Sequence, residues 1–122
     1  MAKILVVDDS DAVRVQLRKD LESKGHNVVE AIDGIDGIKK LEQTEGIQLI
    51  ISDVNMPNMD GFEMCTKIHR DQRYQAIKIF MLTTEASALM KLKGADAGVR
   101  AWIVKPYVAE KLLLAVDKVL QK

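Results

Sequence analysis

The sequence predicts a single α/β domain built as a doubly wound parallel sheet with helices on both faces. Short apolar runs alternate five times with longer segments whose apolar residues recur at helical spacing. The connections between these segments are short, which is typical of units in which a helix crosses over to the next parallel strand. A chain of 122 residues is long enough for one hydrophobic core. We therefore expect one domain over residues 1–122.

Five apolar runs are the predicted strands, and all of them are short. The second run is the least apolar, which favours a place at the edge of the sheet. The predicted strands are Lys3–Asp8, Asn27–Ala31, Gln48–Asp53, Ile77–Leu82 and Arg100–Val104.

Between the strands, apolar residues form helical stripes that are expected to face the sheet. The clearest stripes are Val13, Leu17 and Leu21; Ile35, Ile38 and Leu41; and Leu112, Val116, Val119 and Leu120. Gly25, Gly46 and Gly98 precede the second, third and fifth strands, where glycine commonly ends a helix. Gly94 falls inside a predicted helix, at a cost of about 1 kcal/mol relative to alanine. It is either simply tolerated there or, as we hypothesise, loosens the helix for movement.

Charge and cysteine content argue against several classes of protein. The 18 basic and 18 acidic residues balance, so net charge indicates neither a nucleic-acid partner nor a polybasic membrane anchor. Cys65 is the only cysteine, which rules out an internal disulfide. No apolar run approaches the roughly 20 residues of a membrane span, and no signal-peptide pattern precedes the first strand. We expect a soluble, monomeric protein of the cytoplasm.

Polar residues stand at the carboxyl ends of four predicted strands. Right-handed crossovers restrict the sheet to a few strand orders, and ligands bind where the order reverses. In the order 2-1-3-4-5, the first and third strands are neighbours across that reversal. Asp8, Asp9 and Asp53 would then converge in one crevice, and Thr83 and Lys105 would flank it.

Three converging carboxylates suit phosphoryl transfer with a hard divalent cation. Two unit charges about 4 Å apart interact by about 4 kcal/mol at an effective dielectric constant near 20, so these groups repel unless a cation intervenes. Mg²⁺ takes one or two carboxylates together with waters and phosphate oxygens, and aspartate can itself accept a phosphoryl group. Lys105 and Thr83 could then stabilise the charge of the transferred group. Alternatively, Asp8 and Asp9 merely cap the following helix.

Four motifs together resemble the receiver domain of two-component response regulators, whose fold is a flavodoxin-like (βα)5 sandwich with the same strand order. The resemblance covers the whole chain, and the motifs occur in the family's order at the family's spacing. They are VVDDS at residues 6–10, SDVNMPNMDG at 52–61, MLTTE at 81–85 and WIVKPY at 102–107.

The resemblance implies a role for each site residue. Asp53 matches the aspartate that accepts a phosphoryl group from a histidine kinase. Asp9, Asp53 and the backbone carbonyl of Asn55 match the Mg²⁺ ligands, and Asp8 matches the acid that reaches the metal through water. These correspondences predict a magnesium-dependent phosphoacceptor at Asp53.

The resemblance also implies how the phosphorylated state is detected and how it decays. Thr83 and Lys105 match the residues that bind the phosphoryl oxygens and transmit the signal, and Trp102 matches the aromatic switch position. Asn55 and Glu85 match positions that influence hydrolysis of the acyl phosphate. We therefore expect a short-lived phosphorylated state.

A chain with a receiver domain and nothing else resembles chemotaxis regulators of the CheY type, which dock on the flagellar motor switch. The implied partners are a histidine kinase, this downstream target and a phosphatase, with no nucleic acid or membrane. Within the family, the alternative is a stand-alone receiver that relays phosphate or acts as a phosphate sink. Outside it, the alternatives are an electron carrier, a phosphatase with an aspartyl nucleophile and a phosphate-independent scaffold. The loop DDSDA is too acidic to cradle a flavin phosphate, and Asn55 stands where such phosphatases usually carry a second acid.

Overall fold

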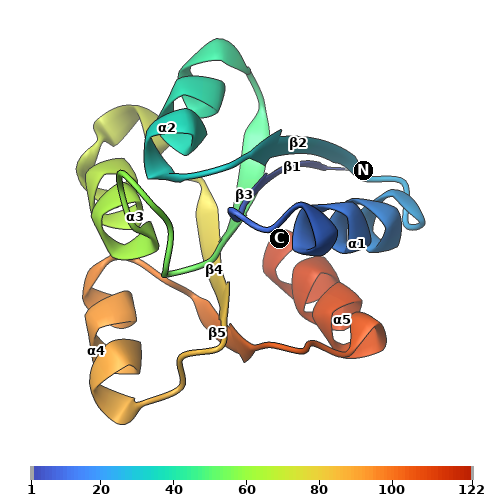
Figure 1. Ribbon diagram of the computed structural model, residues 1–122. Helices are drawn as coiled ribbons and strands as arrows, with labels where there is room; N and C mark the ends of the chain where they lie inside the picture. Colours follow the sequence, from blue (N-terminus) through green and yellow to red (C-terminus); the bar gives the residue numbers. More distant parts are fainter. Residues whose placement is uncertain (1, 122) are drawn as a thin grey trace.

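The computed structural model describes residues 2–121 and has a five-stranded parallel sheet between two layers of helices (Figure 1). The strand order is β2-β1-β3-β4-β5, so the predicted order is confirmed and β2 is an edge strand as expected. The bounds differ from the predicted ones by at most one residue. The strands are β1 (Lys3–Val7), β2 (Asn27–Ala31), β3 (Ile47–Ser52), β4 (Lys78–Thr83) and β5 (Ala101–Val104).

The helices divide between the two faces of the sheet. In Figure 1, α1 and α5 cover one face and α2, α3 and α4 cover the other. The helices are α1 (Asp11–Glu22), α2 (Gly34–Gln43), α3 (Gly61–Arg70), α4 (Ala88–Asp96) and α5 (Ala109–Leu120), and a 3-10 turn, η1 (Gln72–Tyr74), precedes β4.

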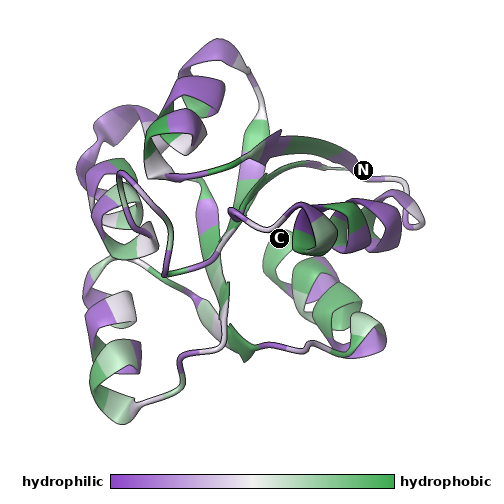
Figure 2. Ribbon diagram, viewed as in Figure 1, coloured by the Kyte–Doolittle hydropathy of each residue, from purple (hydrophilic) through white to green (hydrophobic). Residues whose placement is uncertain are grey.

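Each face of the sheet has its own hydrophobic core, because successive side chains of a strand point to opposite faces. In β1, Ile4 and Val6 belong to the core beneath α1 and α5, whereas Leu5 and Val7 belong to the core beneath α2 and α3. The strands are accordingly mostly hydrophobic in Figure 2, and hydrophilic residues concentrate on the surrounding helices and loops. This burial on both faces explains the continuous apolar runs of the sequence.

One residue of a predicted helical stripe does not face the sheet. Ile35 in α2 is exposed, although Leu41 of the same stripe is buried. The buried side of α2 also includes Gly34 and Gly37. A Cβ at Gly37 would lie 3.3 Å from a methyl group of Val7 and closer still to a sulfur atom of α3. The helix therefore approaches the sheet through its glycines, which rotates Ile35 towards the surface.

The chain reverses at the predicted glycines. Gly25, Gly46 and Gly98 have φ angles of 84°, 84° and 86°, a left-handed conformation that glycine adopts without steric cost. The Lys105–Pro106 peptide bond is cis. Within residues 2–121, no helix is both long and apolar enough to cross a membrane. The terminal residues 1 and 122 of the expected domain lie outside the described residues.

Candidate functional site

Backbone hydrogen bonds extend the sheet by one residue at the places where the predicted site residues stand. The N–H of Asp8 donates to β2 at 3.1 Å, that of Asp53 donates to β1 at 3.0 Å, and that of Lys105 donates to β4 at 2.9 Å. Each residue is thus held by the strand next to its own. The sheet itself brings these side chains to one edge, as predicted from the strand order.

Three carboxylates converge at this edge. An oxygen atom from each of Asp8, Asp9 and Asp53 lies within 4.8 Å of the other two. Asp8 and Asp53 are buried and Asp9 is exposed, so the cluster has one side open to solvent. Carboxylate oxygens are the donors that hard cations such as Mg²⁺ and Ca²⁺ prefer. The chemistry of the donor set and its open side therefore fit a divalent cation.

Lys105 supplies a positive charge to the buried pair. Its Nζ donates to Oδ2 of Asp8 at 2.7 Å and to Oδ2 of Asp53 at 2.9 Å. Burial raises the pKa of the Asp8 carboxyl, and the hydrogen bond from Lys105 offsets this only in part. Burial also lowers the pKa of the Lys105 ammonium, but the hydrogen bonds to Asp8 and Asp53 outweigh it and leave that pKa raised. Lys105 is therefore firmly cationic.

The loop after β3 is held close to Asp53. Oδ1 of Asp53 accepts a hydrogen bond from the N–H of Val54 at 2.7 Å, and the N–H of Gly61 donates to the carbonyl of Val54 at 2.8 Å. A Cβ at Gly61 would lie 2.1 Å from the carbonyl oxygen of Asp53, so only glycine fits there. Asn55 lies in this loop with an exposed side chain.

Glu85 is hydrogen-bonded to the other predicted hydrolysis residue, Asn55, and to both predicted switch residues, Thr83 and Trp102. Its N–H donates to Oγ1 of the fully buried Thr83 at 3.3 Å. Its carboxylate accepts from Nδ2 of Asn55 at 3.2 Å, and its backbone carbonyl accepts from Nε1 of Trp102 at 2.7 Å. The loop after β4 is therefore tied both to the loop after β3 and to β5.

The Trp102 indole is partly buried against α3 and α4. Its ring stacks on Phe62 with centroids 6.0 Å apart and planes inclined by 28°. A Cβ at Gly94 would lie 2.8 Å from Cζ3 of Trp102. Gly94 thus has a packing role that was not predicted: the absence of a Cβ leaves space for the indole ring against α4.

The alternative that Asp8 and Asp9 cap the first helix is wrong. The N-cap of α1 is Ser10, whose hydroxyl accepts the N–H of Val13 at 3.3 Å. Asp11 is the first helical residue, where a negative charge is favourable near the helix N-terminus. Asp8 and Asp9 are therefore free of a capping role.

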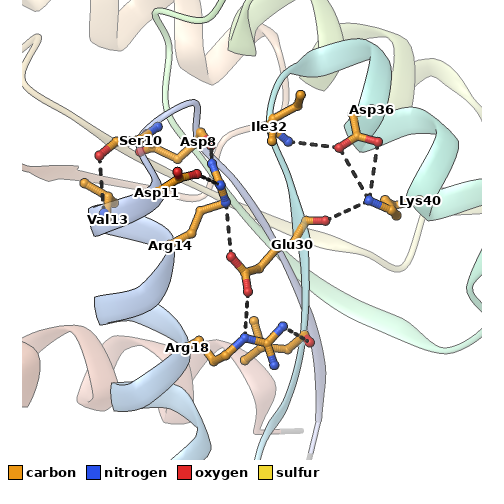
Figure 3. Close-up of polar contacts among 11 residues, drawn as sticks. Asp8, Ser10, Asp11, Val13, Arg14, Arg18, Glu30, Ile32, Asp36 and Lys40 are labelled. Atoms are coloured by element: carbon orange, nitrogen blue, oxygen red, sulfur yellow. Dashed lines mark hydrogen bonds and ion pairs between the residues drawn. The ribbon is translucent and has the colours of Figure 1, made fainter.

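A group of charged residues behind the acidic cluster was not predicted. Arg14, Arg18 and Glu30 form ion pairs between α1 and β2 (Figure 3). Two signals could have revealed them: arginines four residues apart on the helix, and a glutamate inside the apolar run of β2. Arg14 is buried, and a buried charge requires partners.

Comparison with known proteins defines the class to which this fold and site belong. The sequence model of the response regulator receiver domain matches residues 4–117. The chain belongs to this family, whose receiver domains act in phosphorylation-dependent signalling.

Within the family, the chain is similar to chemotaxis proteins. It is 35% identical over 119 residues to the chemotaxis protein CheY homolog of Campylobacter jejuni, covering 97% of this chain and 92% of the relative. The structure of chemotaxis protein CheY4 of Vibrio cholerae superposes with a TM-score of 0.92 at 40% identity, covering 98% of this chain and 99% of that one. A CheY-like receiver domain from Methanospirillum hungatei gives a TM-score of 0.89 at 30% identity, with 97% and 92% covered. The chain is thus a CheY-like receiver domain.

Proposed function

We propose that this protein is a phosphorylation-activated switch of a two-component system, with Asp53 as the phosphoacceptor. The observation that carries the proposal is the Lys105 ammonium, which bonds both Asp8 and Asp53 at the edge of the sheet. A buried carboxylate next to a second carboxylate and a cation suits a nucleophile that must accept a group with negative charge. The proposed domain spans residues 1–122, and we place the protein in the cytoplasm.

The proposed cofactor is Mg²⁺. Asp9, Asp53 and the backbone carbonyl of Asn55 would hold it directly, and Asp8 would contact it through water. A divalent cation at this position would draw phosphate oxygens towards carboxylates that otherwise repel them. The convergence of three carboxylate oxygens within 4.8 Å supports this assignment.

The proposed reaction is transfer of a phosphoryl group from a phosphohistidine of a histidine kinase. A carboxylate oxygen of Asp53 forms a bond to phosphorus while the bond from phosphorus to the imidazole nitrogen breaks, and the imidazole leaves. Lys105 offsets the negative charge of the phosphoryl oxygens, and the Thr83 hydroxyl turns to donate to one of them. Asn55 and Glu85, whose side chains share a hydrogen bond at 3.2 Å, then influence access of the water that hydrolyses the acyl phosphate.

The proposed output surface is formed by α4, β5 and α5. Thr83 and the Trp102 indole both bond to Glu85, so a turn of Thr83 towards a phosphoryl group changes the contacts of the loop that holds Trp102. Apolar side chains on the proposed surface are exposed, as a docking face requires. They are Leu89, Leu92, Val104, Val108 and Leu114. We propose the flagellar motor switch as the target because the relatives are chemotaxis proteins, and a phosphatase as a further partner.

The phosphoacceptor is tested by incubating the protein with Mg²⁺ and a small phosphodonor and recording its intact mass. We expect one phosphoryl adduct on the wild type and on Asp117→Asn, which removes an exposed carboxylate of α5. No adduct is expected on Asp53→Asn. An equal adduct on Asp53→Asn, or none on the wild type, would overturn the assignment.

The target is tested by binding to purified flagellar switch protein with and without phosphodonor. Tighter binding of the phosphorylated form supports the chemotaxis function. An affinity for the switch protein that does not change on phosphorylation, together with transfer of the phosphoryl group to a histidine-containing domain, would favour a phosphorelay intermediate. Phosphorylation followed only by hydrolysis would favour a phosphate sink.

A further inference from the structure

Arg14 is a buried cation on α1 that lies behind the acidic cluster. Its side chain is only 10% exposed. The guanidinium donates to three acceptors from three parts of the chain: the backbone carbonyl of Asp8 at 2.5 Å, the Asp11 carboxylate, and Oε1 of Glu30 at 3.1 Å (Figure 3). It thus links the loop after β1 with the start of α1 and with β2.

Asp9 depends on its backbone for its position. Its side chain is exposed, and no hydrogen bond to its carboxylate occurs among the residues that the structure describes. The carbonyl that Arg14 holds belongs to the peptide bond between Asp8 and Asp9. Because a peptide bond is planar, fixing this carbonyl fixes the direction in which the chain enters Asp9. On the other side of Asp9, the N–H of Ser10 donates to Oδ1 of Asp8 at 2.9 Å. The loop is therefore held on both sides of Asp9.

Glu30 holds the guanidinium of Arg14 in place. Nε of Arg18 donates to the other carboxylate oxygen, Oε2, at 2.7 Å. The backbone carbonyl of Glu30 accepts a hydrogen bond from Nζ of Lys40 at 3.1 Å, so the residue that anchors Arg14 is itself bonded to two helices. Arg14 is therefore bonded to a strand residue that two helices hold, as well as to the exposed Asp11 carboxylate.

We propose that Arg14 is a positioning residue for Mg²⁺: it holds the Asp8–Asp9 peptide so that the Asp9 carboxylate stays directed towards Asp8 and Asp53. This inference rests on the proposed magnesium site. The charge of Arg14 and its effect on the position of Asp9 change the affinity for Mg²⁺ in opposite directions. A guanidinium repels a divalent cation, so removing its charge by itself would tighten Mg²⁺ binding, whereas losing the position of Asp9 weakens it. The sign of the change separates the two effects.

The test is isothermal titration of the full chain with Mg²⁺ in the absence of any phosphodonor. Arg14→Lys keeps the charge but cannot reproduce a planar group that bonds three acceptors. We expect its dissociation constant for Mg²⁺ to rise about tenfold, as for other groups that orient metal ligands. Arg14→Gln should weaken binding at least as much despite losing a positive charge. Arg100→Lys and Arg100→Gln are matched controls at an exposed arginine before β5, and they should change the dissociation constant less than about twofold.

Two further measurements separate positioning from loss of the fold. Urea unfolding without Mg²⁺ reports the stability of each variant, and Arg14→Lys keeps the test available if Arg14→Gln does not fold. The phosphorylation rate of Arg14→Lys at saturating Mg²⁺ should return close to the wild-type rate, because only the metal affinity is changed. A rate that stays low at saturation would overturn the inference.

The titration also distinguishes failure of the inference from failure of the site. A wild-type protein that binds Mg²⁺ and an Arg14→Lys variant that binds it equally well would overturn the role of Arg14 alone. Tighter binding by Arg14→Gln would do the same, since only the charge would then matter. A wild-type protein that binds no Mg²⁺ would overturn the proposed magnesium site, and the role of Arg14 with it.

Discussion

The indole N–H of Trp102 donates to the backbone carbonyl of Glu85 at 2.7 Å. Trp102→Phe keeps an aromatic ring next to Phe62 but leaves this carbonyl without its donor. Loss of one such hydrogen bond should lower the free energy of unfolding by about 1 kcal/mol. Urea unfolding followed by circular dichroism measures this change. Tyr74→Phe also removes a polar group from an aromatic ring and is the control; equal effects of the two substitutions would contradict the prediction.

Gly94→Ala should have opposite effects in two backgrounds. In the wild type the new Cβ would lie 2.8 Å from Cζ3 of Trp102, so the indole must move; this should lower the free energy of unfolding and shift the indole emission to longer wavelength. In a Trp102→Ala background no ring is in the way, and Gly94→Ala should stabilise α4 by about 1 kcal/mol. Urea unfolding of the four proteins measures both effects. The same gain in both backgrounds would show that the indole does not rest on Gly94.

Lys105→Met should destabilise the protein and do so less when Mg²⁺ is present. The side chains of Asp8 and Asp53 are 2% and 11% exposed, and removing their cation leaves two buried carboxylates facing each other. We expect a loss of about 3 kcal/mol without metal. Mg²⁺ binds the folded protein and should restore part of this loss. Unfolding with and without Mg²⁺ measures the difference, and Lys118→Met, which removes an exposed lysine of α5, should show neither effect.

Asp8→Asn should change the pH dependence of stability. Burial raises the pKa of the folded Asp8 carboxyl above its usual value of 3.8, so the folded state binds this proton more tightly than the unfolded state. The contribution of Asp8 to stability is therefore fully present below the unfolded pKa and is lost as the pH rises through the folded pKa. Asparagine does not titrate, so the variant should gain stability relative to the wild type as the pH rises from below the unfolded pKa of Asp8 through its folded pKa.

Unfolding curves at several pH values measure this gain. A difference between Asp8→Asn and the wild type that stays constant with pH would mean that burial does not control the titration of Asp8.

The sequence by itself determined the strands, their order and the acids at their ends. Those features are local or follow from chain connectivity: apolar runs buried on both faces set the strands, and right-handed crossovers limit their order. Because parallel strands end at the same edge of the sheet, the convergence of Asp8 and Asp53 on neighbouring strands follows from the strand order. The contact of Lys105 with both depends on its long side chain, which reaches across the end of β4. The role of Ser10 as the N-cap of α1 and the exposed position of Ile35 were not predicted, since each depends on how a helix begins or packs.

Only the tertiary structure decided which side chains support the site from behind. Arg14 meets Glu30 across the gap between α1 and β2, and Gly94 meets Trp102 across the gap between α4 and β5. These pairs are set by the distance between packed elements and by side-chain rotamers, which leave no periodic signal in the sequence. The sequence does not distinguish a buried arginine from a surface arginine, because it does not show the acceptors. It also does not show that a helical glycine packs against an indole ring.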